Sequence, residues 1–212
     1  MIKQFTFNHF EVNCYLVVDE AAKQCAIVDP ACGSSFEDAA LAQYIEDNSL
    51  TVTHILLTHA HVDHIAGLRQ ACSRYNLPVT MHPDGRKLLR QAEAYGSVMG
   101  FAVDNMDDLK VNEIADNDVI MVGNTAIECR YVPGHCPGSI CFVLPEDKAV
   151  ITGDALFHFS IGRTDLPGGD YPTLIDYIKR RLMTLPDDYR VLPGHGIASQ
   201  IGKERKYNSF LI

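Results

Sequence analysis

The segment that most constrains this chain is THAHVDH, which ends at His64 and directly follows the apolar run HILL. Such a run is typical of a buried strand, and side chains two positions apart on an extended chain point to the same side. His59, His61 and Asp63 would then face one way and His64 the other, so that the two like-facing imidazoles can reach one metal ion. If the chain instead turns from strand into helix here, the four groups can divide between two neighbouring ions. The alternative is an exposed polar turn that binds no metal.

Three further candidate ligands stand where apolar runs end: His135 in YVPGHCPGS, Asp154 in AVITGDALF and His195 in YRVLPGHG. Each follows a glycine, which allows the backbone to turn sharply and to approach its neighbours closely. Because loops at strand ends are a common place for binding sites, we expect these residues and the histidine cluster to meet at one rim of a sheet assembly. Imidazole and carboxylate together favour zinc, iron or manganese over calcium.

The rest of the pattern predicts strands and helices in both halves of the chain. KQFTF, CYLVV and CAIVD have the character of strands, and FEDAALAQYIEDN has helical spacing with Ser34 or Ser35 as its N-cap. DVIMV and TAIECRYV flank the turn pair Gly123-Asn124, which indicates a hairpin, and YPTLIDYIKRRLMTL is the clearest amphipathic helix. Since no linker divides the chain, we expect one domain over residues 1–212, with packed sheets and helices outside.

Composition limits the partners of the chain. A net charge of -9 argues against binding to a nucleic-acid backbone, and no apolar run is long enough to cross a bilayer. Polar residues interrupt the N-terminal segment, so it does not resemble a signal peptide. The 7 cysteines show no C-x-x-C spacing, which favours reduced, buried thiols over disulfides or a cysteine zinc site. We therefore expect a cytoplasmic monomer or small homo-oligomer that acts on a small molecule, without nucleic-acid or membrane partners.

HAHVDH, together with the three distant ligands, resembles the metallo-β-lactamase-fold hydrolases, particularly their glyoxalase II (hydroxyacylglutathione hydrolase) branch. The similarity runs nearly end to end and includes AIVDPA, VPGHCPGS, GDALF, IGRTDLPGGDY and LPGHG. It implies an α/β fold, a four-layer αββα sandwich in which two mixed sheets pack face to face with helices outside.

The resemblance also implies a centre of seven ligands for two divalent metal ions, zinc first, with iron or manganese as alternatives. The first ion would be held by His59, His61 and His135, the second by Asp63, His64 and His195, with Asp154 bridging both. Asp63 would in addition be a catalytic residue that orients or moves a proton.

Three more residues carry expectations. Asp29 in AIVDPA matches a position that supports the metal ligands from behind, although an ordinary turn aspartate before Pro30 is the alternative. Arg163 in GRTD would bind the glycine carboxylate of a glutathione thioester, unless it is a plain surface arginine. Cys136 is expected to be a packed thiol rather than a nucleophile.

The activity implied by the resemblance is hydrolysis of a thioester, S-lactoylglutathione or a related acyl-thiol, by a metal-bound hydroxide. The alternative is a persulfide dioxygenase with one iron held by His59, His135 and Asp154. Full-length glyoxalase II carries a further C-terminal helical domain that we expect to be absent here, and GHGIASQIG departs from the GHGPxT often found in the branch. The sequence therefore supports thioester hydrolysis more firmly than it supports glutathione. Because all seven ligands are kept, a purely structural role is disfavoured.

Overall fold

The computed structural model describes all of residues 1–212 and contains two six-stranded mixed sheets. The first sheet has the strand order β1 (Ile2–Phe7), β2 (Val12–Asp19), β3 (Gln24–Val28), β4 (Thr51–Leu56), β5 (Val79–Met81) and β6 (Val111–Glu113). The second has the order β14 (Ser199–Gln200), β13 (Arg190–Pro193), β10 (Ala149–Gly153), β9 (Ile140–Leu144), β8 (Thr125–Tyr131) and β7 (Val119–Val122). A small separate hairpin consists of β11 (Leu156–Phe157) and β12 (Ser160–Ile161).

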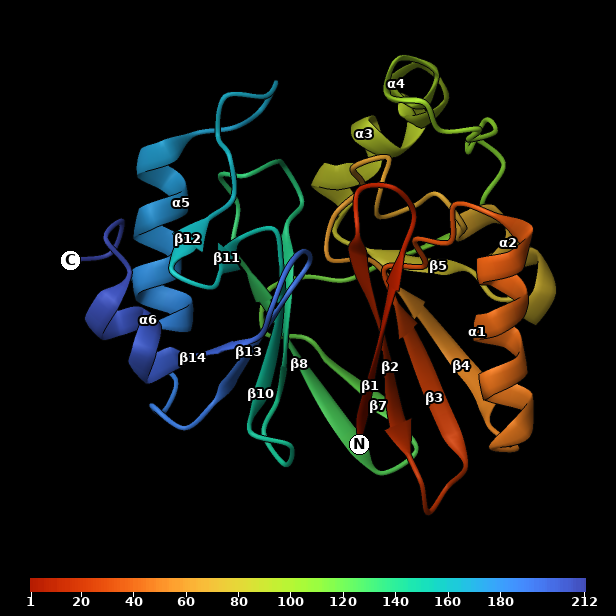
Figure 1. Ribbon diagram of the computed structural model, residues 1–212, viewed down its shortest axis with the longest axis horizontal. Helices are drawn as coiled ribbons and strands as arrows, with labels where there is room; N and C mark the ends of the chain where they lie inside the picture. The colour runs from red at the N-terminus through yellow and green to blue at the C-terminus, as the bar shows by residue number, and fades with distance from the viewer.

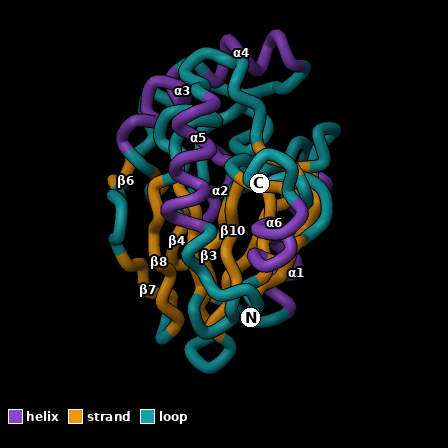
Figure 2. Tube along the Cα trace, turned by 90° about the vertical axis from the view of Figure 1, so that its left-hand side faces the viewer, coloured by secondary structure: helices purple, strands orange, loops and turns teal.

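Helices cover the two outer faces and one end of the sandwich (Figure 1). They are α1 (Ser35–Asp47), α2 (Leu68–Tyr75), η1 (Pro83–Gly85), α3 (Arg86–Arg90), α4 (Ala92–Met99), α5 (Tyr171–Tyr177), η2 (Ile178–Leu182) and α6 (Ile201–Tyr207). Figure 1 shows α1 and α2 outside the first sheet, α5 and α6 outside the second, and α3 with α4 at the upper end of the sandwich. In the view turned by 90°, α5 and α6 lie in front of the strands while α3 and α4 remain at the top (Figure 2). The predicted αββα sandwich is confirmed.

Strand β2 explains why the apolar runs of this chain are continuous rather than alternating. All eight of its residues are buried. Tyr15 and Val17 enter the core between the two sheets, whereas Cys14, Leu16 and Val18 pack in the layer beneath α1. A strand covered on both faces has no solvent side on which to place polar residues, so residues 14–18 are all apolar. The two polar residues of β2, Asn13 and Asp19, stand near its ends, where hydrogen bonds compensate for their burial.

The elements expected from the sequence largely agree with the structure, with two differences. Ser34 is the N-cap of α1, and its side chain accepts a hydrogen bond from the backbone of Glu37. The helix expected directly after the histidine cluster begins only at Leu68, because residues 62–67 form turns. The long amphipathic helix is α5 followed by the π-helical segment η2. None of the helices combines the length and the apolar character needed to cross a membrane.

Hydrogen bonds join the two sheets at the upper end of the sandwich. The backbone amide of Asn13 on β2 donates to the carbonyl of Gly194, at 2.7 Å, and its side-chain amide donates to the carbonyl of Pro193, at 3.0 Å. The amide of Ile140 on β9 donates to the carbonyl of Thr58, which follows β4, at 2.8 Å. The strand ends of both sheets are therefore fixed relative to one another at this end of the molecule.

A buried carboxylate fixes the C-terminal helix. Glu204 on α6 is completely buried and accepts hydrogen bonds from the backbone amide of Phe159 at 3.1 Å, from the Asn208 side-chain amide at 2.8 Å and from the Ser199 hydroxyl. Phe159 lies in the turn of the β11–β12 hairpin, so this one side chain connects α6 to that hairpin.

We predict that Glu204→Ala lowers the free energy of unfolding by about 3 kcal/mol, because several buried donors would lose their acceptor at once. Urea unfolding followed by circular dichroism measures the change. Glu146→Ala is the matched control, since Glu146 is exposed between β9 and β10. An effect of Glu204→Ala no larger than that of the control would show that the hydrogen bonds do not stabilise the fold.

Candidate metal centre

The structure brings all seven candidate ligands together at the upper end of the sandwich, between the ends of strands from both sheets. Four of them follow β4, one lies in the loop after β8, one directly follows β10 and one follows β13. We call this group the His/Asp centre; its members are His59, His61, Asp63, His64, His135, Asp154 and His195.

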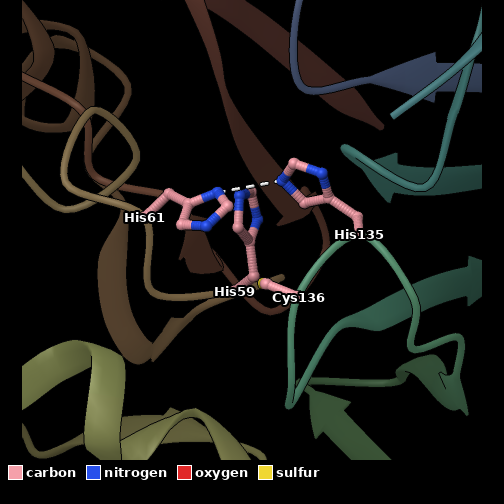
Figure 3. A group of neighbouring side chains, drawn as sticks. All are labelled: His59, His61, His135 and Cys136. Carbon is pink, nitrogen blue, oxygen red and sulfur yellow. Dashed lines mark hydrogen bonds between the residues drawn. The ribbon is translucent and has the colours of Figure 1, made fainter. Parts of the chain in front are cut away.

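Three histidines form one half of the centre. The Nδ1 atom of His61 and the Nε2 atom of His135 lie 2.9 Å apart, with the His59 ring between them (Figure 3). The ligand atoms of the three rings lie within 4.8 Å of one another. His59 Nε2 is buried and has no hydrogen-bond partner. Because a buried polar atom without a partner is costly, this nitrogen is placed as a ligand would be.

The other half of the centre contains Asp63, His64 and His195. The Nε2 atoms of the two histidines face each other at 3.3 Å. Asp63 Oδ2 lies 3.3 Å from His195 Nε2 and 3.8 Å from His64 Nε2. Two imidazole nitrogens and a carboxylate oxygen therefore surround a second point beside the first.

Asp154 lies between the two halves. Its Oδ1 is 3.3 Å from His64 Nε2, and its Oδ2 is 3.7 Å from His135 Nε2 and 3.6 Å from His195 Nε2. Asp154 Oδ1 is buried and, like His59 Nε2, lacks a hydrogen-bond partner. This position corresponds to that of a carboxylate shared by both halves.

Glycines make this close packing of ligands possible. Gly153 has φ +49°, a conformation that L side chains rarely adopt, and a side chain there would overlap Thr58. A side chain on Gly194 would overlap the Asp154 carboxylate. The glycines that precede Asp154 and His195 therefore allow the backbone to approach its neighbours closely, as their positions before the two ligands indicated.

The prediction that His64 faces away from His59, His61 and Asp63 on an extended chain is wrong. The chain leaves the extended conformation after His61, and the amide of His64 donates to the carbonyl of His61 at 3.1 Å. This turn directs His64 toward the other ligands instead of away from them. The alternative arrangement, in which the chain curls and the four groups divide between two points, agrees with the structure.

Asp29 supports both halves of the centre. Its carboxylate accepts hydrogen bonds from the Thr58 amide at 2.7 Å, from the Thr58 hydroxyl at 2.6 Å and from His64 Nδ1 at 2.9 Å. Since the Thr58 hydroxyl donates to Asp29, it accepts from Nδ1 of His59, 3.0 Å away. One carboxylate therefore sets the tautomers of two histidines so that their Nε2 lone pairs face the centre.

Backbone carbonyls orient two other histidines. His135 Nδ1 donates to the carbonyl of Arg163 at 2.8 Å, and His195 Nδ1 donates to the carbonyl of Phe10 at 2.9 Å. Sequence patterns gave no sign of Phe10, because any residue type can provide a carbonyl. Both contacts place the proton on Nδ1, so the Nε2 lone pair of each histidine is available to bind a metal ion.

The electrostatic environment differs between the halves. Burial lowers the pKa of His59 well below its usual value, and burial together with His135 lowers the pKa of His61 to about 4. Burial acts the same way on His64, but the carboxylates of Asp154 and Asp63 outweigh it and raise the pKa of His64 well above the usual value. The first half is therefore ready to bind a cation, whereas His64 would release a proton on binding one.

Cys136 lies next to the first half but is not directed into it. Its thiol is buried, contacts the Ser139 hydroxyl at 3.4 Å, and lies at the base of His59 in Figure 3, away from the converging nitrogens. Burial raises the pKa of Cys136 to about 12, so a thiolate is disfavoured. The Cys136 sulfur lies within 4.8 Å of the ligand atoms of the three histidines, but its raised pKa disfavours it as a ligand. The seven candidate ligands are imidazole and carboxylate groups, a donor set that fits zinc, iron or manganese.

We predict that Asp29→Asn weakens metal binding by about 10-fold to 100-fold, because the amide has a single acceptor oxygen. That oxygen cannot accept from the Thr58 backbone amide on one side and from the Thr58 hydroxyl and His64 Nδ1 on the other. Asparagine suits this position, since the backbone of Asp29 has φ 52°. Competition with a chromophoric chelator measures the affinity. Asp19→Asn is the matched control, because Asp19 is also buried and accepts three backbone hydrogen bonds, at the other end of β2. Equal affinities in the two variants would contradict the supporting role of Asp29.

Comparisons with known proteins agree with this geometry. Residues 8–195 match the sequence pattern of the metallo-beta-lactamase superfamily. The hydroxyacylglutathione hydrolase GloC of Haemophilus influenzae is 35% identical over 211 residues, which span 95% of this chain and 93% of that protein. Among solved structures, the BLEG-1 B3 metallo-beta-lactamase has a TM-score of 0.89 and 30% identity, covering 100% of this chain and 99% of that one. TTHA1623 in a di-iron-bound form has a TM-score of 0.86 and 34% identity, and the match covers 99% of this chain and 100% of that one. This chain, with its metal-binding His/Asp clusters between two sheets, therefore belongs to the metallo-beta-lactamase superfamily.

Proposed function

We propose that this chain is a metal-dependent thioesterase of glyoxalase II type, which cleaves S-lactoylglutathione or a related acyl-thiol to a carboxylic acid and a free thiol. The observation that carries the proposal is the His/Asp centre, in which two buried ligand atoms, His59 Nε2 and Asp154 Oδ1, have no partner within the protein. The similarity to a hydroxyacylglutathione hydrolase over most of both chains supports the choice of substrate class.

Two zinc ions would occupy the centre. The first would be held by His59, His61 and His135, the second by Asp63, His64 and His195, with Asp154 between them. When bound, such ions lower the pKa of a water molecule and polarise a carbonyl group. The protein's own part is to fix the ligands through Asp29, Thr58 and the two backbone carbonyls, and to accept a proton. Asp63 Oδ2, at 3.3 Å from His195 Nε2, would take up the proton of the attacking water.

Arg163 remains the proposed substrate-binding residue, but its guanidinium already has a partner. Its Nε and one terminal nitrogen donate to the Asp165 carboxylate at 2.8 and 2.7 Å, and its side chain is 60% exposed. A substrate carboxylate would have to displace Asp165 in order to bind this arginine. Thioester hydrolysis is therefore a firmer part of the proposal than recognition of glutathione through Arg163.

A persulfide dioxygenase is the second candidate. It would use one iron at His59, His135 and Asp154, and Asp154 Oδ2 lies 3.7 Å from His135 Nε2. The TTHA1623 structure, which is described as di-iron-bound, favours keeping iron in consideration. Metal quantification on the purified protein separates the candidates when it is combined with two assays: hydrolysis of S-lactoylglutathione and oxygen consumption with glutathione persulfide. Two zinc ions with thioester turnover support the first candidate; one iron with oxygen consumption supports the second.

We predict that Asp154→Ala removes metal and thioesterase activity together, lowering kcat/KM by at least about 1000-fold, because both halves of the centre lose a shared carboxylate. Metal content by mass spectrometry and steady-state kinetics on the same preparation measure the two losses. Asp188→Ala is the control, since Asp188 forms an exposed ion pair with Lys148. An Asp154→Ala protein that retains two ions and normal turnover would exclude the two-ion proposal.

A further inference from the structure

A cavity of about 210 Å³ opens directly beside the His/Asp centre. On one side it is lined by ligands of the centre, among them His61, His135 and His195. The opposite side is apolar. We call this side the apolar wall; its residues are Phe10, Leu88, Ala92, Tyr95 and Met99.

The apolar wall is fixed to the part of the fold that carries the His/Asp centre. Helices α3 and α4 provide four of its residues, and the loop between β1 and β2 provides Phe10. His9 Nε2 donates to the carbonyl of Met99 at 3.3 Å, and the His9 ring stacks on Phe101, which follows α4, at a centroid distance of 4.5 Å. The carbonyl of Phe10 also orients His195. The loop that holds a ligand of the centre therefore also holds the end of α4.

Away from the His/Asp centre, the cavity offers no free positive charge. Its charged lining residues are Asp63 and Asp154, which belong to the centre, and Arg163. Both oxygens of the Asp165 carboxylate are already paired with Arg163, and no lysine lines the cavity. A carboxylate or phosphate placed against the apolar wall would lose its hydration without gaining a partner, which is strongly unfavourable.

A second hollow leaves the centre in another direction. It shares four lining residues with the first cavity and adds Phe157 and Gly196. The residues shared by both hollows are His135, Asp154, Arg163 and His195. A substrate whose reacting carbonyl lies at the centre can therefore extend one substituent along the apolar wall and the other past Arg163.

We propose that the acyl chain of the substrate lies against the apolar wall and is selected for being uncharged and apolar, while the charged thiol leaves through the second hollow. This inference rests on the proposed thioesterase function and specifies its substrate class, thioesters of apolar carboxylic acids. The exposed position of Met99 and Tyr95, at 38% and 36%, leaves apolar surface that an acyl chain would cover.

Binding of thioethers tests the inference without turnover. S-methyl-, S-butyl- and S-hexylglutathione carry an alkyl group in place of the acyl group and have no cleavable bond. Isothermal titration of the metal-loaded protein should show affinity rising about threefold for each added methylene until the cavity is filled. Replacing the glutathione part by uncharged N-acetylcysteamine should change affinity by less than about threefold, because Arg163 is already paired with Asp165 and no other cationic side chain lining the two hollows can bind the glutathione carboxylates. Affinity independent of alkyl length would overturn the proposal.

Two neighbouring substitutions on α4 provide the matched pair. Met99→Lys places a charge on the apolar wall and should abolish the dependence on alkyl length. Val98→Lys adds the same charge at the adjacent position, which is 85% exposed and does not line the cavity, and should leave the dependence intact. Thermal melts check that both variants fold. Equal behaviour of the two variants would contradict the assignment of the wall.

The outcomes separate this inference from the proposed function. If thioethers bind with the predicted length dependence but no acyl-thiol is hydrolysed, the proposed function fails and the apolar subsite stands. If S-lactoylglutathione and longer acylglutathiones are hydrolysed with the same kcat/KM and thioether affinity is independent of length, the function stands and the inference fails.

Discussion

The site depends first on the Asp29 carboxylate and the three hydrogen bonds that it accepts. Asp29 follows β3 and Thr58 follows β4, so this contact lies where two parallel strands of the first sheet end side by side. The same carboxylate accepts directly from His64 Nδ1 and acts on His59 through the Thr58 hydroxyl. It thereby determines which nitrogen of each histidine carries the proton. His59 belongs to the first half of the centre and His64 to the second, so Asp29 orients a ligand in each half.

The second requirement is that the two sheets keep their relative position. Four ligands come from the first sheet and three from the second, so a small shift between the sheets would separate the two groups. The hydrogen bonds of Asn13 to Gly194 and of Ile140 to Thr58 prevent such a shift next to the ligands themselves. Phe10 extends this rigidity to the cavity, because its carbonyl holds His195 and its ring forms part of the apolar wall. Ligand geometry and substrate selection thus depend on the same loop.

The residues that the structure brings together at the His/Asp centre could be identified from the sequence, because each stands at the end of an apolar run or within one dense cluster. Strands such as β2 were recognisable for a similar reason, since burial on both faces keeps their central residues apolar. Local patterns could not reveal the partners of His135 and His195, because backbone carbonyls carry no sequence signature and the Phe10 contact joins residues 185 positions apart. The apolar wall was missed likewise, as the helical pattern of α3 and α4 does not show which apolar side chains face a cavity. The pairing of Arg163 with Asp165 depends on side-chain conformation, which spacing alone does not fix.

The proposed function depends on two metal ions held side by side by seven side chains from both sheets. Anomalous X-ray diffraction from crystals of the metal-loaded protein, recorded on both sides of the metal absorption edge, tests it most directly. We expect two peaks about 3.5 Å apart, one among His59, His61 and His135 and the other among Asp63, His64 and His195, with Asp154 between them. A single peak held by His59, His135 and Asp154 alone would contradict it.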